Sequence, residues 1–331
     1  MKIESFLIPD RRVYGRYVRF SLNRIPQENG RVITPEKSDL NDDSENCIFC
    51  PDGHLWVPGK KPFTIENEYP ASSPFAVVPE EFADIDGVMP SLGFCYITVT
   101  RGHRKELWDL NYLETIDTVD ELAKIYDALI GKEIVDGVDV RHVSIYMNIG
   151  RGGGQTVLHP HFKIEATHHF VAEASLRMER AEKEQNLYSE EIECAEKNET
   201  VLYEDGDFVG FVPSWAGFPY EICILPRDSE KHSFSEFSED DFTSFSKVLY
   251  QTMKMGRAII GEDPLQGNII FYQLPNCPFS FEFIPMNLGG GKYKRLGATA
   301  YTGDYINEYP PGIAAKRIRD AFFKHTPNTN I

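Results

Sequence analysis

The chain has 331 residues and a formal net charge of −17, with 34 lysines and arginines against 51 aspartates and glutamates. This balance argues against a broad electrostatic surface for nucleic acid or anionic membranes, although a locally positive pocket could still bind anionic small molecules. The length allows one large or two ordinary domains with a sizeable core, so six cysteines are not needed as disulfide staples.

The N-terminal stretch Met1 to Asp10 becomes charged too early for a signal peptide. No apolar run approaches the roughly 20 residues that a membrane-spanning helix requires. We therefore expect a cytoplasmic protein.

A strand-like, arginine-rich segment, Arg11 to Phe20, precedes a polar stretch that ends at Asn46 and is typical of a loop. Cys47 and Cys50 follow at once, and Pro51 to Gly53 turns the chain, as in a knuckle that gives two ligands to a tetrahedral metal. Two buried structural cysteines are one alternative. A thioredoxin-type redox pair is another, but no helix signal follows the second cysteine.

Strand-like runs follow at 63–71, 75–79 and 94–100, and His103 comes just after the last of them, a common place for a ligand. Helical spacing of apolar residues covers 115–135, and a short apolar strand covers 143–148.

That strand leads into Asn148 to Lys163, which reads Asn-Ile-Gly-Arg-Gly-Gly-Gly-Gln-Thr-Val-Leu-His-Pro-His-Phe-Lys. Glycines let a backbone approach phosphate closely, and Thr156 adds a hydroxyl. If the segment after the proline is extended, His159 and His161 point to the same face. A glycine-rich loop alone can be a simple turn, whereas the loop joined to the histidine pair indicates a site.

The second half repeats this order. After a helical and linker segment rich in charged residues, we expect strands at 208–213 and 220–225, a helix at 237–260, and strands at 268–273 and 279–284. In this alignment Pro278 and Ser280 take the places of His159 and His161. The prediction is an α+β protein with a mainly antiparallel sheet and flanking helices. It has an N-terminal unit at 1–170, a helical linker at 171–200, and a C-terminal unit without the nucleophile at 201–331.

These features together resemble the galactose-1-phosphate uridylyltransferase-like family of the histidine-triad superfamily, whose fold would be two fused histidine-triad-like repeats forming a half-barrel. The motifs that carry the resemblance are Cys47 to Cys50, Asn67-Glu-Tyr-Pro-Ala71, Asn148 to Lys163, Val212 to Glu221, and Thr302 to Asn307.

The resemblance implies one structural zinc ion held by two cysteines and two histidines, here Cys47, Cys50, His103 and His159. Thiolate and imidazole are ligands that zinc prefers, and four protein ligands make a closed, structural site. His54, close to the knuckle, is the alternative to His103.

By the same resemblance His161 is a nucleophile that attacks the α-phosphorus of a nucleoside diphosphate compound and carries the nucleotide covalently. Asn67 and Glu68 would lie by the nucleoside, although an ordinary turn explains them equally well. The expected phosphate-binding groups are Asn148, Gly153, Gly154, Thr156 and Lys163.

Three departures from the family pattern stand out. Lys163 replaces the usual glutamine and adds a full charge. The family's sugar-contacting glutamate is replaced within Gly297 to Ala300, which leaves galactose selection open. The histidines that bind a second metal in some members are missing around Pro278 and Ser280, so one metal is expected.

The resulting hypothesis is a nucleotidyltransferase of galactose or related carbohydrate metabolism, and the resemblance suggests a homodimer. It would move a UMP-like group between a nucleotide sugar and a sugar 1-phosphate or inorganic phosphate by a ping-pong route. One alternative is a nucleotide-sugar or dinucleotide phosphorylase or hydrolase. The other is a zinc-stabilised nucleotide-binding protein without turnover.

Overall fold

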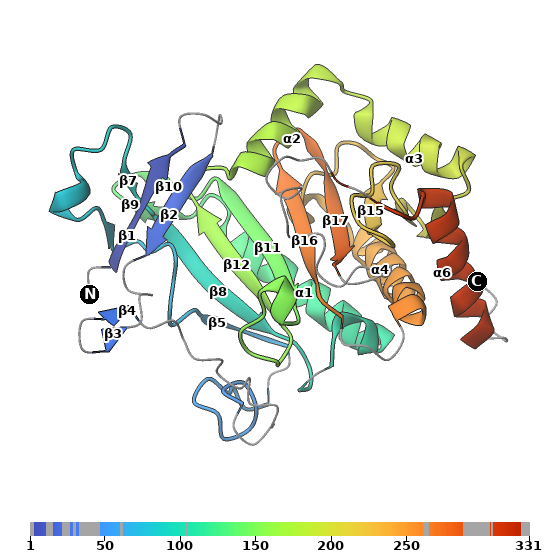
Figure 1. The fold of residues 1–331 in the computed structure, drawn as a ribbon, viewed down its shortest axis with the longest axis horizontal. Coiled ribbons are helices and arrows are strands. Elements are labelled where there is room, and N and C mark those ends of the chain that lie inside the picture. Colours follow the sequence, from blue (N-terminus) through green and yellow to red (C-terminus); the bar gives the residue numbers. More distant parts are fainter. Residues whose placement is uncertain are drawn as a thin grey trace.

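The computed structural model describes residues 3–10, 16–21, 27–28, 31–32, 47–59, 62–103, 105–260, 265–286, 305 and 307–325. Its centre is a nine-stranded antiparallel sheet, drawn in Figure 1. In sheet order the strands are β13 (Val201–Asp205), β14 (Phe208–Phe211), β15 (Ile222–Pro226), β17 (Cys277–Pro285), β16 (Gly267–Leu274), β11 (His142–Ile149), β12 (His161–Thr167), β8 (Gly93–Val99) and β5 (Phe63–Glu66).

The sheet contains two units of the same topology. The first runs β5, β8, helix α1 (Tyr112–Leu129), β11, β12, and the second runs β14, β15, helix α4 (Glu239–Ile260), β16, β17. In both, the helix connects the second strand to the third, and the fourth strand lies between them in the sheet. The units join through the antiparallel β11–β16 pair. This confirms the α+β architecture of two fused histidine-triad-like repeats, while the exact limits at 170 and 200 stay a prediction.

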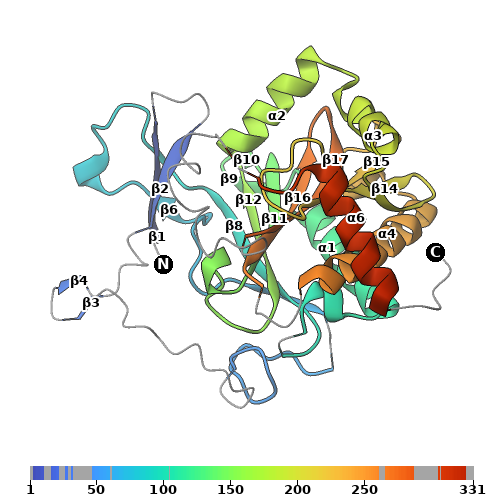
Figure 2. The ribbon, with the colours of Figure 1, turned by 45° about the vertical axis from the view of Figure 1, so that its right-hand side comes forward.

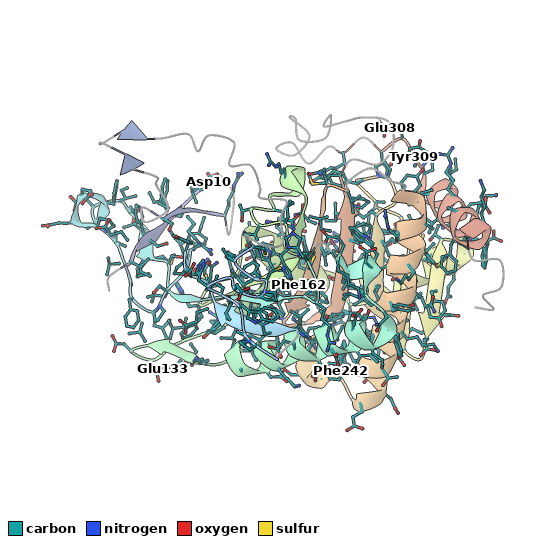
Figure 3. All side chains as sticks on the ribbon, turned by 90° about the horizontal axis from the view of Figure 1, so that it is seen from below. Asp10, Glu133, Phe162, Phe242, Glu308 and Tyr309 are labelled. Atoms are coloured by element: carbon teal, nitrogen blue, oxygen red, sulfur yellow. The ribbon has the colours of Figure 1, made fainter. Side chains whose placement is uncertain are left out.

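The two faces of the sheet differ in character. Phe162, Ile164 and Ala166 of β12 are fully buried in the main core together with residues of α1 and α4, and in Figure 3 Phe162 lies in the interior. Because side chains alternate along a strand, His161 and Lys163 point to the opposite face, here named the outer face. On β17 the same alternation puts Phe281 in the core and Ser280 on the outer face. The chemistry-bearing side chains therefore share the face away from α1 and α4.

Helix α1 begins earlier and ends earlier than the predicted range of 115–135. The Asn111 side chain accepts a hydrogen bond from the Glu114 amide at 3.0 Å, and the Glu114 carboxylate accepts one from the Asn111 amide at 2.8 Å, which forms a capping box. Gly131 has a φ of 71°, in the left-handed region that stops a helix. The prediction that the helix continued to 135 was wrong, because a short hairpin follows this glycine.

Most other predicted elements of the described residues are present, but the strand predicted at 63–71 ends at Glu66 and the one predicted at 75–79 covers only Ala76–Val77. Helices α2 (Ala172–Lys183) and α3 (Leu187–Lys197) occupy the charged segment between the units. Figure 2 shows helix α6 (Pro311–His325), which the sequence analysis missed, packed along α4. The remaining elements are β1 (Ile3–Pro9), β2 (Tyr17–Ser21), β3 (Gln27–Glu28), β4 (Arg31–Val32), β6 (Ala76–Val77), β7 (Met89–Pro90), β9 (Glu133–Val135), β10 (Val138–Asp139), and the 3-10 turns η3 (Glu80–Phe82), η4 (Leu107–Asp109), η5 (Arg151–Gly153) and η6 (Phe234–Glu236).

Two expectations fall outside the described residues. They are most of the polar stretch predicted as a loop after Phe20 and up to Asn46, in which the structure describes only Ser21 and the short strands β3 (Gln27–Glu28) and β4 (Arg31–Val32), and the altered sugar-contacting segment, Gly297 to Ala300. Among the helices that the structure describes, none is both long and apolar enough to cross a membrane.

Candidate functional site

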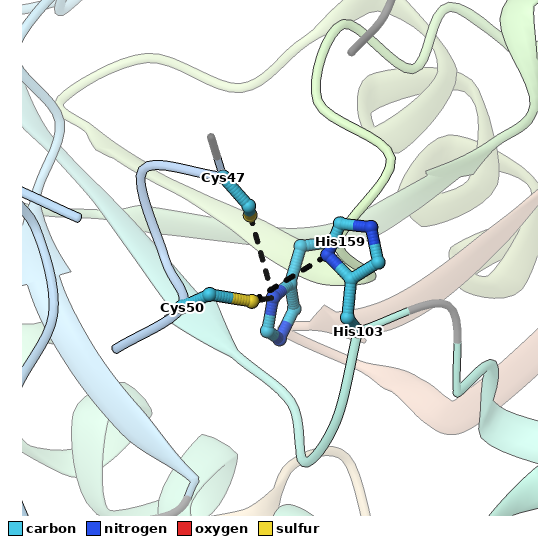
Figure 4. Close-up of side chains that lie close together, drawn as sticks. All are labelled: Cys47, Cys50, His103 and His159. Carbon is cyan, nitrogen blue, oxygen red and sulfur yellow. Dashed lines mark hydrogen bonds between the residues drawn. The ribbon is translucent and has the colours of Figure 1, made fainter. Parts of the chain in front are cut away.

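Four side chains that are far apart in the sequence converge beside the first unit, as Figure 4 shows. The ligand atoms of Cys47, Cys50, His103 and His159 all lie within 4.8 Å of one another. The Cys50 sulfur lies 3.5 Å from Nδ1 of His103 and 3.5 Å from Nδ1 of His159, and the Cys47 sulfur lies 3.7 Å from Nδ1 of His159. The cluster could therefore hold a metal ion.

The geometry fits a tetrahedral metal with the bond lengths of zinc. Zinc–sulfur bonds of about 2.3 Å and zinc–nitrogen bonds of about 2.0–2.1 Å in a tetrahedron put sulfur and nitrogen about 3.5–3.6 Å apart. The observed separations are close to that edge length. His159 is also oriented for ligation, because its Nε2–H donates to the Thr100 carbonyl at 3.1 Å and leaves Nδ1 for a metal. His54, the alternative ligand, instead contacts Glu68 at 3.2 Å.

The knuckle that carries both cysteines depends on a tight turn. The Cys50 amide donates to the Cys47 carbonyl at 3.1 Å, and the Gly53 amide donates to the Cys50 carbonyl at 2.9 Å. A Cβ on Gly53 would lie 2.4 Å from the carbonyl oxygens of Cys47 and Ile48, so the close approach requires glycine. Phe49 packs with Val99 of β8 in one apolar cluster, which ties the knuckle to the sheet.

His161 is the first residue of β12 and is only 4% exposed. Its Nδ1–H donates to the His159 carbonyl at 2.8 Å, so the lone pair is on Nε2. The hydrogen bonds of the described residues involve Nδ1 of His161 and not Nε2. Burial, assisted by the charge of Lys163, lowers the pKa of His161 to about 4, although the His159 carbonyl raises it. The imidazole is neutral near pH 7 and has one nitrogen available for chemistry.

Phe49 connects the metal cluster to this histidine. Its ring centroid lies 5.9 Å from that of His159 and 5.4 Å from that of His161. The knuckle residue between the two cysteines therefore packs against both imidazoles. The sequence analysis did not assign it a role, although its place inside Cys-x-x-Cys was visible.

The glycine loop between β11 and β12 is closely held. Gly150 and Gly154 have φ values of 66° and 89°, which favour glycine. The Asn148 amide group donates to the Gly154 carbonyl at 3.2 Å. Asn148 is thus a support of the loop from inside the first unit.

The second unit holds the same loop from the other side. The Asn268 amide group donates to Oδ1 of Asn148 at 2.9 Å and to the Gly153 carbonyl at 3.0 Å. Gln266 accepts a hydrogen bond from the Gly152 amide at 2.5 Å. A Cβ on Gly153 would lie 2.2 Å from the Gly267 carbonyl oxygen, so only glycine permits this approach to β16. The sequence analysis missed Asn268 and Gln266, and only the pairing of β11 with β16 reveals them.

The other predicted ligand-binding residues are placed as follows. The amides of Gly153 and Gly154 donate within the turn, each at 3.1 Å, to carbonyls of Gly150 and Arg151. In this conformation these amides are not available to donate hydrogen bonds to phosphate. The predicted direct contact with phosphate would require the loop to open. Thr156 is exposed, and Lys163 shares the outer face with His161.

Asn67 and Glu68 make local contacts. Oδ1 of Asn67 accepts from the Tyr69 amide at 3.0 Å, which is the turn expected for an unspecialised residue, while Glu68 pairs with His54. Asn67 also lines a pocket of about 220 Å³ at the β5–β8 edge. Their assignment to a nucleoside stays a prediction.

Comparison with known proteins places these features among relatives. No protein-family model matches the chain. It is 29% identical over 199 residues to a galactose-1-phosphate uridylyltransferase of Thermotoga maritima, covering 55% of the chain and 60% of that relative. It is 24% identical over 200 residues to an ADP-glucose phosphorylase of Arabidopsis thaliana, covering 57% and 54%. The matches thus span less than two thirds of these relatives.

Solved structures agree with the fold over nearly the whole chain. A uridylyltransferase structure superposes with a TM-score of 0.75 at 20% identity, covering 97% of the chain and 99% of that structure. An Arabidopsis thaliana ADP-glucose phosphorylase with bound ADP-glucose superposes with a TM-score of 0.62 at 21% identity, covering 96% and 99%. The resemblance to galactose-1-phosphate uridylyltransferases is therefore confirmed by sequence relatives, and the chain shares the fold of a uridylyltransferase.

Proposed function

We propose that the chain is a nucleotidyltransferase in which His161 carries a nucleoside monophosphate between a nucleotide sugar and a sugar 1-phosphate or inorganic phosphate. The observation that carries the proposal is the state of His161. It is a buried, neutral imidazole whose Nδ1, and not Nε2, is hydrogen-bonded to a carbonyl. The similarity to galactose-1-phosphate uridylyltransferases supports the same reaction class.

The reaction consists of two displacements. Nε2 of His161 attacks the α-phosphorus, and the bond from that phosphorus to the bridging oxygen breaks, so the sugar 1-phosphate leaves with the electron pair. An oxygen of the acceptor phosphate then attacks the same phosphorus, and the bond to Nε2 breaks and returns its electrons to the imidazole. No proton must be removed from the nucleophile, and the His159 carbonyl stabilises the positive charge that develops on the ring.

Charge and positioning come from neighbouring groups. Lys163 lies on the same face two residues after His161, where it can neutralise phosphate oxygens. Asn148, Gly153, Gly154 and Thr156 shape and line the loop beside it, and Asn67 with Glu68 is proposed to contact the nucleoside. Asn268 and Gln266 make the loop rigid from the second unit.

The Cys47, Cys50, His103 and His159 cluster fits one structural zinc ion, which would fix the knuckle and the strand that bears His161. The same proposal includes a cytoplasmic homodimer divided into units 1–170 and 201–331 by a helical linker at 171–200. Light scattering of the purified protein tests the dimer.

A covalent intermediate gives the direct test of the proposed reaction. Donors labelled at the α-phosphate, UDP-glucose and ADP-glucose, are mixed with the protein without acceptor, and the denatured protein is assayed for label. We expect label on the wild type and on the control His168→Ala, whose histidine lies outside the site, and none on His161→Ala. Turnover of His161→Ala at the wild-type rate would refute the role of this residue.

A phosphorylase is the second candidate, favoured by the extra charge of Lys163 and by the similarity to an ADP-glucose phosphorylase. Product analysis with inorganic phosphate alone, and then with a sugar 1-phosphate, separates the two reactions. Release of free nucleoside monophosphate without either acceptor indicates a hydrolase. Tight nucleotide binding without exchange under every acceptor identifies a binding protein.

A further inference from the structure

A pocket of about 250 Å³ lies on the outer face of the second unit, between β15 and β17 and the helices α2 and α3. In Figure 1 these two helices lie over the ends of the strands. Cys223 and Leu225 of β15 pack with α3 on this face, and Tyr188 borders the pocket where α3 begins. The pocket is separate from the metal cluster and from the glycine loop.

Its place in the repeat corresponds to that of His161 in the first unit. Strand β17 takes the position of β12, and the sequence repeat aligns Ser280 with His161. Ser280 lies on the outer face and lines the pocket. The second unit thus has a concave site at the place that corresponds to His161, with a serine hydroxyl instead of an imidazole.

The Ser280 hydroxyl indicates that the pocket binds a ligand. Ser280 is 2% exposed, and its hydroxyl has no hydrogen-bond partner in the part of the chain that the structure describes. Buried hydroxyl groups are nearly always hydrogen-bonded, because leaving one without a partner forfeits its interactions with water. A molecule in the pocket would supply the missing partner.

The charged residues around the pocket do not favour a ligand that carries a phosphate group. Arg177 is matched by Glu282, with contacts of 2.7 and 3.2 Å, and by Glu173 at 2.9 Å. Arg180 pairs with Glu184 at 2.7 Å. Glu191, which also lines the pocket, adds a further carboxylate. No surplus positive charge is left among these residues to attract an anion.

The aromatic residues that line the pocket favour a ligand that contains a ring. Trp215, from the β14–β15 loop, lines the pocket and is 44% exposed, and Tyr188 also lines it. Indole and phenol rings offer flat apolar surfaces to rings of similar size. The carboxylates of Glu191 and Glu282 can accept hydrogen bonds from hydroxyl groups on such a ring.

We propose that this pocket is a second, non-catalytic binding site for an uncharged, hydroxylated ring compound that stacks on Trp215 and hydrogen-bonds to Ser280. Free sugars and nucleosides share this chemistry. The proposal does not rest on the reaction of His161.

The test measures binding to the full chain by calorimetry, with D-glucose and D-galactose in one arm and uridine and adenosine in the other. Glucose 1-phosphate serves as the phosphorylated counterpart. We expect one arm to bind, and Ser280→Ala to weaken that binding by about three- to tenfold, the effect of one lost hydrogen bond. Leu187→Trp, which fills the pocket, should abolish it. The control Ser246→Ala, a buried serine of α4 outside the pocket, should leave it unchanged.

Thermal unfolding without ligand checks the variants. Because the Ser280 hydroxyl has no partner, Ser280→Ala should unfold at the wild-type temperature or above it. A clear drop in that temperature would overturn the argument from the unpartnered hydroxyl. The proposal is also overturned if no uncharged compound binds at concentrations up to about 10 mM, or if Ser280→Ala and Leu187→Trp bind as the wild type does.

Discussion

Replacing Asn268 tests whether the second unit holds the catalytic loop of the first. Asn268→Ala removes two hydrogen bonds, to Oδ1 of Asn148 at 2.9 Å and to the Gly153 carbonyl at 3.0 Å. At about 0.5–1.5 kcal/mol each, the loop loses about 1–3 kcal/mol of support. If the reaction needs the loop in this conformation, the rate of nucleotidyl transfer falls by about 5- to 150-fold. Label transfer to His161 in a single turnover measures this rate.

A matched control separates positioning from stability. Asn307 also donates one hydrogen bond to a carbonyl, that of Ala216 at 2.9 Å, and accepts another from the Tyr309 amide at 3.0 Å, but neither partner belongs to the loop. Asn307→Ala should lose about 1–3 kcal/mol of stability and keep its rate. Asn268→Asp should be slower than Asn268→Ala, because it places a carboxylate against two acceptor oxygens. If Asn268→Ala reacted at the wild-type rate while it lost stability, the loop would not need this support.

Three other predictions concern the metal, the pH dependence and the acceptor. Metal analysis should find about one zinc ion per wild-type chain and none in Cys50→Ser. The variant should also lose several kcal/mol of stability, since structural zinc contributes folding free energy. Freshly purified wild-type protein without metal would contradict this prediction. Burial, with the negative charge of Glu282, raises the pKa of Glu221 from 4.5 to about 7. Between these pH values the folded chain binds a proton that the unfolded chain does not. The free energy of unfolding therefore falls by up to about 3 kcal/mol as pH rises through this range. Chemical denaturation at pH 5 and 8 measures this fall, and Glu221→Gln should make it smaller. If the fall were unchanged in the variant, other groups would be its cause. Lys163→Gln should slow transfer to inorganic phosphate by about tenfold and transfer to a sugar 1-phosphate less, whereas equal effects would exclude acceptor selection by this charge.

Most of the sheet could be predicted from local pattern. The alternation of buried and half-buried residues along β11 and β12 is visible in the sequence, because one face of these strands packs on helices and the other does not. The helix α4 follows from apolar spacing in the same way. The end of α1 was misplaced because apolar residues continue after Gly131, where the left-handed backbone stops the helix.

The spacing of Cys47 and Cys50 and the histidine pair after the glycine loop indicated candidate residues. The complete set of metal ligands and the role of His161 were assigned through the family resemblance. Nothing local relates Cys50 to His103 or His159, since the three meet only after β8 and β12 have paired. Asn268 was out of reach for a similar reason. It lies 120 residues from Asn148, and the two become neighbours through the register of β11 against β16.

The β11–β16 pair also explains why a unit without a nucleophile is retained. Gln266 and Asn268 reach the glycine loop because β16 continues the sheet next to β11. In a single unit, β11 would be an edge strand, and the Gly152 amide and Gly153 carbonyl would lose these partners. A second unit that carries Pro278 and Ser280 in place of the histidine pair still makes these contacts with the loop. What it cannot change freely is the start of β16, where a Cβ on Gly267 would lie 2.5 Å from the Ile284 carbonyl oxygen of β17 and where Asn268 holds the loop in place.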